Sequence, residues 1–201
     1  MTKKNKHIIF DLGGVLFHWN PKEILRILKK EDPLFPENIP EITMTKAWTD
    51  FDTGLITLNE TIEILAETYQ RIHLERFIEL SLEKLAPIEH GVRILTNVQA
   101  QGNRTFILSN ISEEFLNILS PHHQFLKSVD GAVFSYEIKA VKPQEKIYKE
   151  LLNKYHLKPE ECLFIDDSPA NIKTAQDIGI IGILCQDHLQ VEKELKDHGI
   201  L

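Results

Sequence analysis

The chain has 201 residues, and its 23 basic and 30 acidic side chains give a formal net charge of −7 at pH 7. This acidic balance argues against nucleic acid as a partner, because proteins that bind the phosphate backbone usually present a basic face. No apolar run approaches the roughly 18 residues that a membrane-spanning helix requires. Too few apolar residues follow the basic start to form a signal-peptide core, so we expect a cytoplasmic protein with no membrane partner.

A chain of this length can bury one sizeable core and carry a smaller insert. Its two cysteines, Cys162 and Cys185, each lie beside an apolar stretch and show no CxxC spacing. Buried free thiols are therefore expected, and neither a disulfide framework nor a zinc site is indicated.

The first predicted element is a strand at residues 7–11, a short apolar run. Residues 17–86 contain no convincing strand, but they carry helical patterns that include 21–30, 58–69 and 71–85. We interpret 17–86 as a helical cap subdomain inserted after the first strand. The two flanking parts, 1–16 and 87–201, are then expected to form one α/β core domain.

Beyond the insert, strand and helix patterns alternate. Strand character is seen at 104–108, 131–134, 162–165 and 180–184. Helical character is seen at 89–101, 112–120, 144–156, 169–178 and 188–197. The strand segments are almost continuously hydrophobic, which is typical of strands covered on both faces. The alternation predicts a parallel α/β sheet with right-handed crossovers.

Polar side chains collect at the ends of these predicted strands. Asp11 leaves the first strand, and Gly13 and Gly14 follow it in a turn that lets a ligand approach the backbone closely. The other strands are followed by Ser109-Asn110, by Lys142-Pro143 and by Asp166-Asp167-Ser168, with Asn171 one helical turn later. Each residue alone has an ordinary explanation as a cap, a turn or a solvated charge. Their shared position points to a site, because open α/β sheets bind ligands beyond the carboxyl ends of their strands.

The charges of these residues indicate what the site binds. Asp166 and Asp167 are adjacent, and Asp11 converges on them if the first and fourth strands are neighbours. Crowded like charges raise one another's pKa and destabilise the ionised site. A Mg²⁺ ion removes this repulsion, and it prefers one or two carboxylates together with water and a substrate phosphate. Lys142 adds a point charge for the phosphate, so the sequence predicts a magnesium-assisted phosphate site.

This order of motifs resembles the haloacid dehalogenase-like (HAD) hydrolase superfamily over nearly the whole chain. The matching segments are FDLGGVLF at Asp11, ILSN at Ser109, VKPQEKIY at Lys142 and FIDDSPANI at Asp166 and Asp167. The resemblance implies a Rossmann-like sheet, a cap after the first motif and hydrolysis of small phosphorylated metabolites. The DLGGV form is similar to the branch that contains bacterial sugar-1-phosphate phosphatases, so sugar 1-phosphates are one candidate substrate class.

The resemblance also implies roles for residues at matching positions. Asp11 would be the nucleophile, forming an aspartyl-phosphate intermediate that water then hydrolyses. Ser109 and Asn110 would hold the phosphoryl oxygens. Lys142 would neutralise the developing charge and restrain Asp11.

The expected Mg²⁺ ligands are Asp11, the backbone carbonyl of Gly13 and Asp167. Asp166 would bind the ion directly or through a water molecule. Asn171 would orient the acidic pair.

One position departs from the family pattern. Most phosphatases of this family carry a second aspartate two residues after the nucleophile as a general acid, and this chain has Gly13 there. Loss of a general acid typically costs about 10²–10⁴-fold in rate. The protein is then a catalytically degenerate binding or regulatory protein, a 2-haloacid dehalogenase, or a phosphatase whose leaving group needs less protonation. The intact acidic pair and Lys142 favour the phosphatase, and water, His18 or Asn20 could supply the proton.

Trp19 has two interpretations: stacking on a sugar ring at the mouth of the site, or packing the cap against the core. Trp48 and Phe51 are expected in the core of the cap. The expected partner is a small phosphorylated substrate, and the sequence leaves open whether the protein is a monomer or a homodimer.

Overall fold

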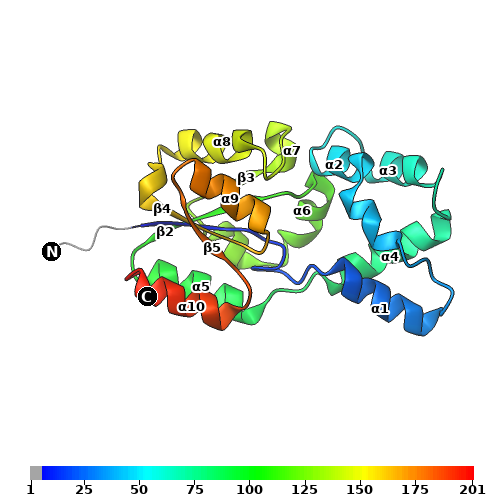
Figure 1. The fold of residues 1–201 in the computed structure, drawn as a ribbon, viewed down its shortest axis with the longest axis horizontal. Helices are drawn as coiled ribbons and strands as arrows, with labels where there is room; N and C mark the ends of the chain where they lie inside the picture. Colours follow the sequence, from blue (N-terminus) through cyan, green and yellow to red (C-terminus); the bar gives the residue numbers. More distant parts are fainter. Residues whose placement is uncertain (1–5) are drawn as a thin grey trace.

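The computed structural model describes residues 6–201, and its centre is a five-stranded sheet of order β3-β2-β1-β4-β5 (Figure 1). The strands are β1 (His7–Phe10), β2 (Arg104–Ser109), β3 (Gly131–Phe134), β4 (Cys162–Asp166) and β5 (Ile181–Leu184). All neighbouring strands are parallel, which confirms the predicted α/β sheet. Because β1 lies between β2 and β4, the residues that follow these three strands meet at one edge.

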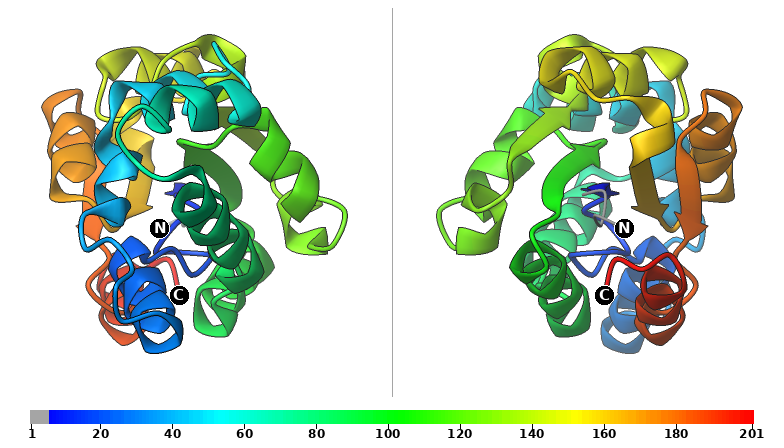
Figure 2. Two further views of the ribbon diagram at one scale, coloured as in Figure 1. Left: turned by 90° about the vertical axis from the view of Figure 1, so that its right-hand side faces the viewer. Right: turned by 90° about the vertical axis from the view of Figure 1, so that its left-hand side faces the viewer.

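Helices cover both faces of the sheet, as the two side views in Figure 2 show. On one face lie α5 (Glu89–Ala100) and α10 (His188–Asp197), and on the other α8 (Glu145–Tyr155) and α9 (Pro169–Asp177). Alternate residues of β1 enter different cores: Ile8 and Phe10 pack in the cluster that includes α5, and Ile9 packs in the cluster that includes α8. This two-sided burial explains the continuous hydrophobicity of the strand sequences.

The segment after β1 forms a group of helices beyond the carboxyl end of the sheet (Figure 1). These elements are α1 (Pro21–Glu31), the 3₁₀ helix η1 (Ile39–Met44), α2 (Lys46–Asp52), α3 (Leu58–Leu65) and α4 (Arg71–Lys84). The helix predicted at 58–69 ends four residues early, at Leu65. The N–H groups of Thr68 and Tyr69 both donate to the Leu65 carbonyl, at 3.0 and 2.9 Å, and so close the helix with a tight turn.

Two further helices, α6 (Glu113–Leu119) and α7 (Ser135–Ile138), follow β2 and β3 directly. The sequence predicted α6 to within a residue at each end but did not predict α7. A helix of four residues is little more than one turn, which is too short to show an amphipathic period. The sequence also did not predict α2, which has seven residues.

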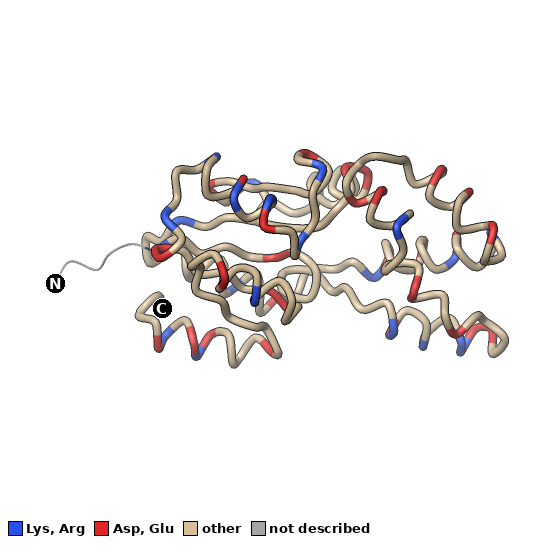
Figure 3. The backbone as a smooth tube through the Cα atoms, turned by 45° about the horizontal axis from the view of Figure 1, so that its top comes forward, with Lys and Arg blue, Asp and Glu red and all other residues tan. Residues whose placement is uncertain are grey.

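Both cysteines are buried free thiols, as predicted. Within residues 6–201, no helix has the length and apolar character needed to cross a membrane. Basic and acidic residues are interspersed along the outer helices (Figure 3), where they form ion pairs such as Arg71–Glu75 and Lys173–Asp177. Exposed pairs of this kind contribute about 0–1 kcal/mol each, so they add little to the stability of the fold.

Candidate active site

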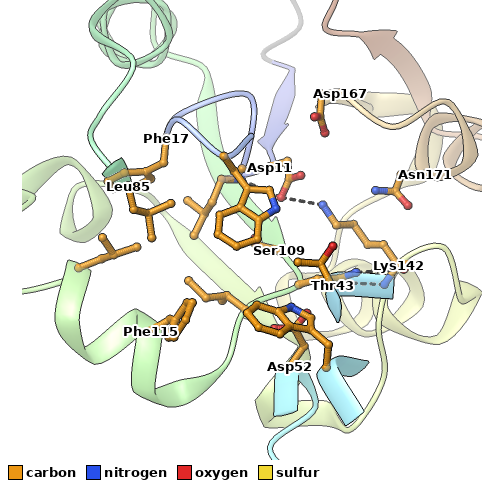
Figure 4. A pocket seen from close by; sticks show the side chains of 17 residues that line it. Asp11, Phe17, Thr43, Asp52, Leu85, Ser109, Phe115, Lys142, Asp167 and Asn171 are labelled. Atoms are coloured by element: carbon orange, nitrogen blue, oxygen red, sulfur yellow. Dashed lines mark hydrogen bonds and ion pairs between the residues drawn. The ribbon is translucent and has the colours of Figure 1, made fainter. Parts of the chain in front are cut away.

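The carboxyl ends of β1, β2 and β4 open into one cavity of about 240 Å³ (Figure 4). Seven of the predicted site residues line it: Asp11, Gly13, Ser109, Asn110, Lys142, Asp167 and Asn171. The eighth, Asp166, is the last residue of β4 and is fully buried. Pairing of β1 with β4, with Phe10 opposite Ile165, brings the three aspartates together as expected.

Lys142 connects two of these aspartates. Its Nζ lies 2.7 Å from Oδ1 of Asp11 and 2.6 Å from Oδ2 of Asp166, and all three side chains are buried. Burial lowers the pKa of Lys142, but the two carboxylates outweigh it, and the pKa lies above its ordinary value. The lysine is therefore a fixed cation at the base of the cavity.

Asp166 is fully engaged by hydrogen bonds. Its Oδ1 accepts from the Ser168 N–H at 2.8 Å and from Asn171 Nδ2 at 2.9 Å, and its Oδ2 accepts from Asn171 at 3.1 Å and from Lys142. The backbone carbonyl of Asn171 accepts a hydrogen bond from the Tyr148 hydroxyl at 3.0 Å. These contacts lock the carboxylate in place and explain how a buried charge is tolerated.

Asp11, Asp166 and Asp167 each offer a carboxylate oxygen, and these oxygens lie within 4.8 Å of one another. Burial, opposed by Lys142 and reinforced by Asp166, raises the pKa of Asp11 to about 7. Burial and the neighbouring Asp166 also raise the pKa of Asp167. Hard oxygen donors crowded in this way fit a divalent cation such as Mg²⁺, which would offset their repulsion.

Ser109 ends β2 and is buried, and it lines the cavity next to Asn110. The side chain of Asn110 is bonded to the backbone of Lys142 at both ends. Its Nδ2 donates to the Lys142 carbonyl at 3.0 Å, and its Oδ1 accepts from the Lys142 N–H at 2.7 Å. This positioning of the lysine was not predicted, because the two residues are 32 positions apart.

The two glycines after Asp11 differ in what they permit. Gly14 has φ +70°, and a Cβ there would lie 2.4 Å from Oδ2 of Asp167, so no other residue fits without moving that carboxylate. At Gly13 a Cβ would lie 3.3 Å from the Cβ of Trp19. The space beside the position of the family's second aspartate is therefore filled by Trp19.

The two suggested proton donors near this turn do not line the cavity. His18 is exposed, and its backbone N–H donates to the Ala86 carbonyl at 2.9 Å. The Asn20 side chain caps α1 by accepting from the Glu23 N–H at 3.1 Å. Neither side chain is placed to protonate a leaving group in the cavity.

Residues of the helical insert also line the cavity, and the sequence did not assign them to the site. They are Thr43 in η1, and Trp48 and Asp52 in α2. Trp48 is buried in the core as predicted, yet it also faces the cavity. Burial raises the pKa of Asp52 to about 7. No periodic pattern signals such residues, because their approach to the sheet depends on how the whole insert folds.

The sheet gathers a lysine, a serine and three aspartates around one cavity, which is the arrangement that the motifs of a hydrolase predicted. Residues 5–179 match the family model of the haloacid dehalogenase-like hydrolases, and the chain belongs to this family. The predicted resemblance is thereby confirmed, as are the enzyme class and the fold.

The chain is similar to several proteins of this family. It is 25% identical over 194 residues to the sesquiterpene phosphatase astK of Aspergillus oryzae, covering 95% of each chain. It is 25% identical over 186 residues to the D-ribitol-5-phosphate phosphatase of Bacteroides thetaiotaomicron, covering 87% of this chain and 88% of that one. A HAD family enzyme from the same organism, solved in complex with magnesium and inorganic phosphate, superposes with a TM-score of 0.70 at 24% identity. That match covers 90% of this chain and 94% of the other.

Proposed function

We propose that the protein is a Mg²⁺-dependent phosphatase of small phosphorylated metabolites that works through an aspartyl-phosphate intermediate. The observation that carries this proposal is the buried Asp11–Lys142–Asp166 ion-pair chain, with Asp167 close enough to share a cation. Two relatives named as phosphatases and a structural neighbour holding magnesium and phosphate support it.

In the proposed reaction a carboxylate oxygen of Asp11 attacks phosphorus and the P–O bond to the ester oxygen breaks, so that an acidic leaving group departs as its anion and takes a proton from water. The Ser109 hydroxyl donates to a phosphoryl oxygen, and Lys142 neutralises the charge that develops on the transferring group. The Asn110 side chain holds Lys142 in position through its two hydrogen bonds to the Lys142 backbone. Water then hydrolyses the aspartyl-phosphate and regenerates Asp11.

Mg²⁺ would be held by Asp11, Asp167 and the Gly13 carbonyl, with Asp166 binding directly or through water and Asn171 orienting Asp166. It would supply positive charge against the phosphoryl oxygens and between the crowded carboxylates.

We further propose that residues 17–86 act as a cap over a core formed by 1–16 and 87–201. Thr43, Trp48 and Asp52 of this cap line the cavity, which favours a role in selecting the leaving group and excluding water. The leaving group meets no carboxylate at Gly13, so an ester with an acidic leaving group, such as an aryl or anomeric phosphate, fits best. Sugar 1-phosphates remain one candidate class on this ground.

The proposal is tested by Asp11→Asn, which keeps the side-chain shape but removes the nucleophile. We expect hydrolysis of p-nitrophenyl phosphate to fall by about 10³-fold or more. Asp197→Asn, on the exposed face of α10, is the control and should leave the rate unchanged. Turnover retained in Asp11→Asn would contradict the assignment of Asp11 as the nucleophile. Turnover in the presence of EDTA would contradict the requirement for Mg²⁺.

Gly13 motivates a second candidate function, a binding or regulatory protein on a degenerate hydrolase fold. This candidate predicts that the protein binds phosphate esters but shows no turnover across a broad panel with Mg²⁺. Halide release from a 2-haloacid without added metal would instead identify a dehalogenase.

A further inference from the structure

The walls of the cavity away from the acidic end are apolar. In Figure 4 the side chains of Phe17, Leu85 and Phe115 lie on the opposite side of the cavity from Asp167 and Asn171. Two tryptophans complete these walls: the ring centroids of Trp19 and Trp48 lie 6.2 Å apart, with an interplanar angle of 29°.

A leaving group rich in hydroxyls would bury them against carbon here, and buried hydroxyls without hydrogen-bond partners are costly. The walls therefore fit an apolar leaving group. The cavity, at about 240 Å³, is smaller than the roughly 300–1,000 Å³ usual for ligand sites, so a leaving group the size of a ring fits it better than a long chain.

Two polar residues of the insert, Thr43 and Asp52, interrupt this apolar surface, and the Thr43 hydroxyl already donates to the Pro40 carbonyl at 2.9 Å. Asp52 is the last residue of α2, and its carboxyl group makes no hydrogen bond or ion pair with any residue that the structure describes. The carboxyl end of a helix disfavours negative charge, so the position adds to the cost of ionisation. Partial burial makes ionisation of this carboxyl group costly, and a ligand with a hydrogen-bond donor would offset part of that cost.

The backbone of Asp52 is tied to the phosphate-binding loop through Ser135. The Ser135 Oγ donates to the Asp52 carbonyl at 2.6 Å and accepts from the Ile111 N–H at 2.9 Å. Ile111 follows Ser109 and Asn110 directly in the chain. A short chain of hydrogen bonds therefore fixes the distance between the Asp52 backbone and the proposed phosphoryl site. A fixed distance of this kind lets the site select substrates by their length.

We propose that the substrate is a phosphate ester whose leaving group is an apolar ring bearing a hydroxyl or amine at its far end, and that Asp52 binds this donor. The inference rests on the proposed phosphatase function and names its substrate class. Asp52 is thereby a specificity residue that acts on the part of the substrate remote from phosphorus.

Three aryl phosphates test this with the phosphate chemistry held nearly constant: 4-ethylphenyl, 4-(2-hydroxyethyl)phenyl and 4-(2-aminoethyl)phenyl phosphate. The two-carbon spacer keeps the acidity of the three phenols similar, so differences in kcat/KM report the distal group. We expect at least one donor-bearing ester to exceed the ethyl ester by roughly tenfold, the size of one good hydrogen bond. Asp52→Leu should erase this preference, so that the three esters differ little in kcat/KM.

Asp50→Asn, on the same helix and paired with Lys46, is the matched control and should keep the wild-type preference. Equal kcat/KM for all three esters in the wild type would overturn the inference, as would an Asp52→Leu variant that keeps the preference or slows all three esters alike. If the wild type turns over none of them with Mg²⁺, the proposed function has failed, and a binding measurement still decides the role of Asp52.

That measurement uses the three free phenols and the intrinsic fluorescence of the protein. The chain has two tryptophans, and both line the cavity, so their quenching reports occupancy. We expect a donor-bearing phenol to bind roughly tenfold tighter than 4-ethylphenol in the wild type and no tighter in Asp52→Leu. Equal affinities in the wild type would refute the proposed contact whether or not the enzyme is active.

Discussion

Gly14 shows how one missing side chain shapes the metal site. Its φ of +70° lies in the left-handed region, and a Cβ would come within 2.4 Å of Oδ2 and 3.0 Å of the Cβ of Asp167. The contact involves the start of the aspartate side chain and not only its tip, so rotation of the carboxylate cannot relieve it. The backbone of the first loop thus sets where Asp167 can point.

We therefore predict that Gly14→Ala displaces Asp167 and raises the Mg²⁺ concentration for half-maximal activity by about tenfold or more. Gly102→Ala is the matched control, because Gly102 has φ +79° and nothing within 4 Å of the added Cβ. Both variants should lose about 1–2 kcal/mol of stability from the left-handed backbone. A metal titration that gives the same midpoint for both variants would contradict the steric argument.

At the scale of elements, the loop after β2 and the segment before α8 are joined by one side chain. Asn110 bonds both the N–H and the carbonyl of Lys142, so the lysine's backbone is fixed from the neighbouring strand. The Lys142 side chain then reaches back to β1 and β4 through Asp11 and Asp166. Three strand ends are in this way coupled through a single residue.

We predict that Asn110→Ala lowers kcat roughly tenfold or more with a smaller change in KM, because Lys142 loses its alignment with the reacting group. Stability should fall by about 1–3 kcal/mol from the lost hydrogen bonds. The control is Asn103→Ala, a buried asparagine that bonds the carbonyls of Val98 and Ile200 away from the cavity. Asn103→Ala should lose comparable stability and keep the wild-type kcat. A similar fall in kcat in both variants would show that Asn110 has only a structural role.

At the scale of the whole molecule, the cavity concentrates carboxyl groups with raised pKa values. Asp11 and Asp52 both titrate at about 7, and the pKa of Asp167 is also raised. Between about pH 4 and 7 the folded protein therefore holds protons that the unfolded chain has released, so these groups make stability fall as pH rises. Lys142 stays protonated throughout this range and adds no slope.

We predict that Mg²⁺ raises the Tm more at pH 8 than at pH 5, because the ion replaces protons that are lost at the higher pH. At a Mg²⁺ concentration 100 times its Kd, binding raises the free energy of unfolding by about 2.7 kcal/mol. Calorimetry with and without Mg²⁺ at the two pH values measures this difference, and Asp167→Asn should reduce it. A Tm at pH 8 that does not respond to the ion would contradict a metal site among these carboxylates.

The sequence predicted the acidic end of the cavity because simple rules govern it. Asp11, Ser109 and Asp166 end or follow apolar strands, and the carboxyl ends of parallel strands share an edge. Asp52 could not be placed, since it ends a seven-residue helix whose approach to the sheet depends on the packing of the whole insert. The Asn110–Lys142 contact depends on side-chain rotamers and spans 32 positions, so no local pattern reports it.

The contact between positions 13 and 19 has a consequence for how this site can change. A carboxylate at 13 and an indole at 19 compete for adjoining space, since the first carbon of each would lie 3.3 Å apart. Gly13→Asp in the presence of Trp19 would crowd the turn. Replacement of Trp19 by a smaller residue would remove part of the aromatic wall of the cavity. We therefore expect Gly13→Asp and a substitution of Trp19 to have non-additive effects on stability and activity, because the two side chains share this space.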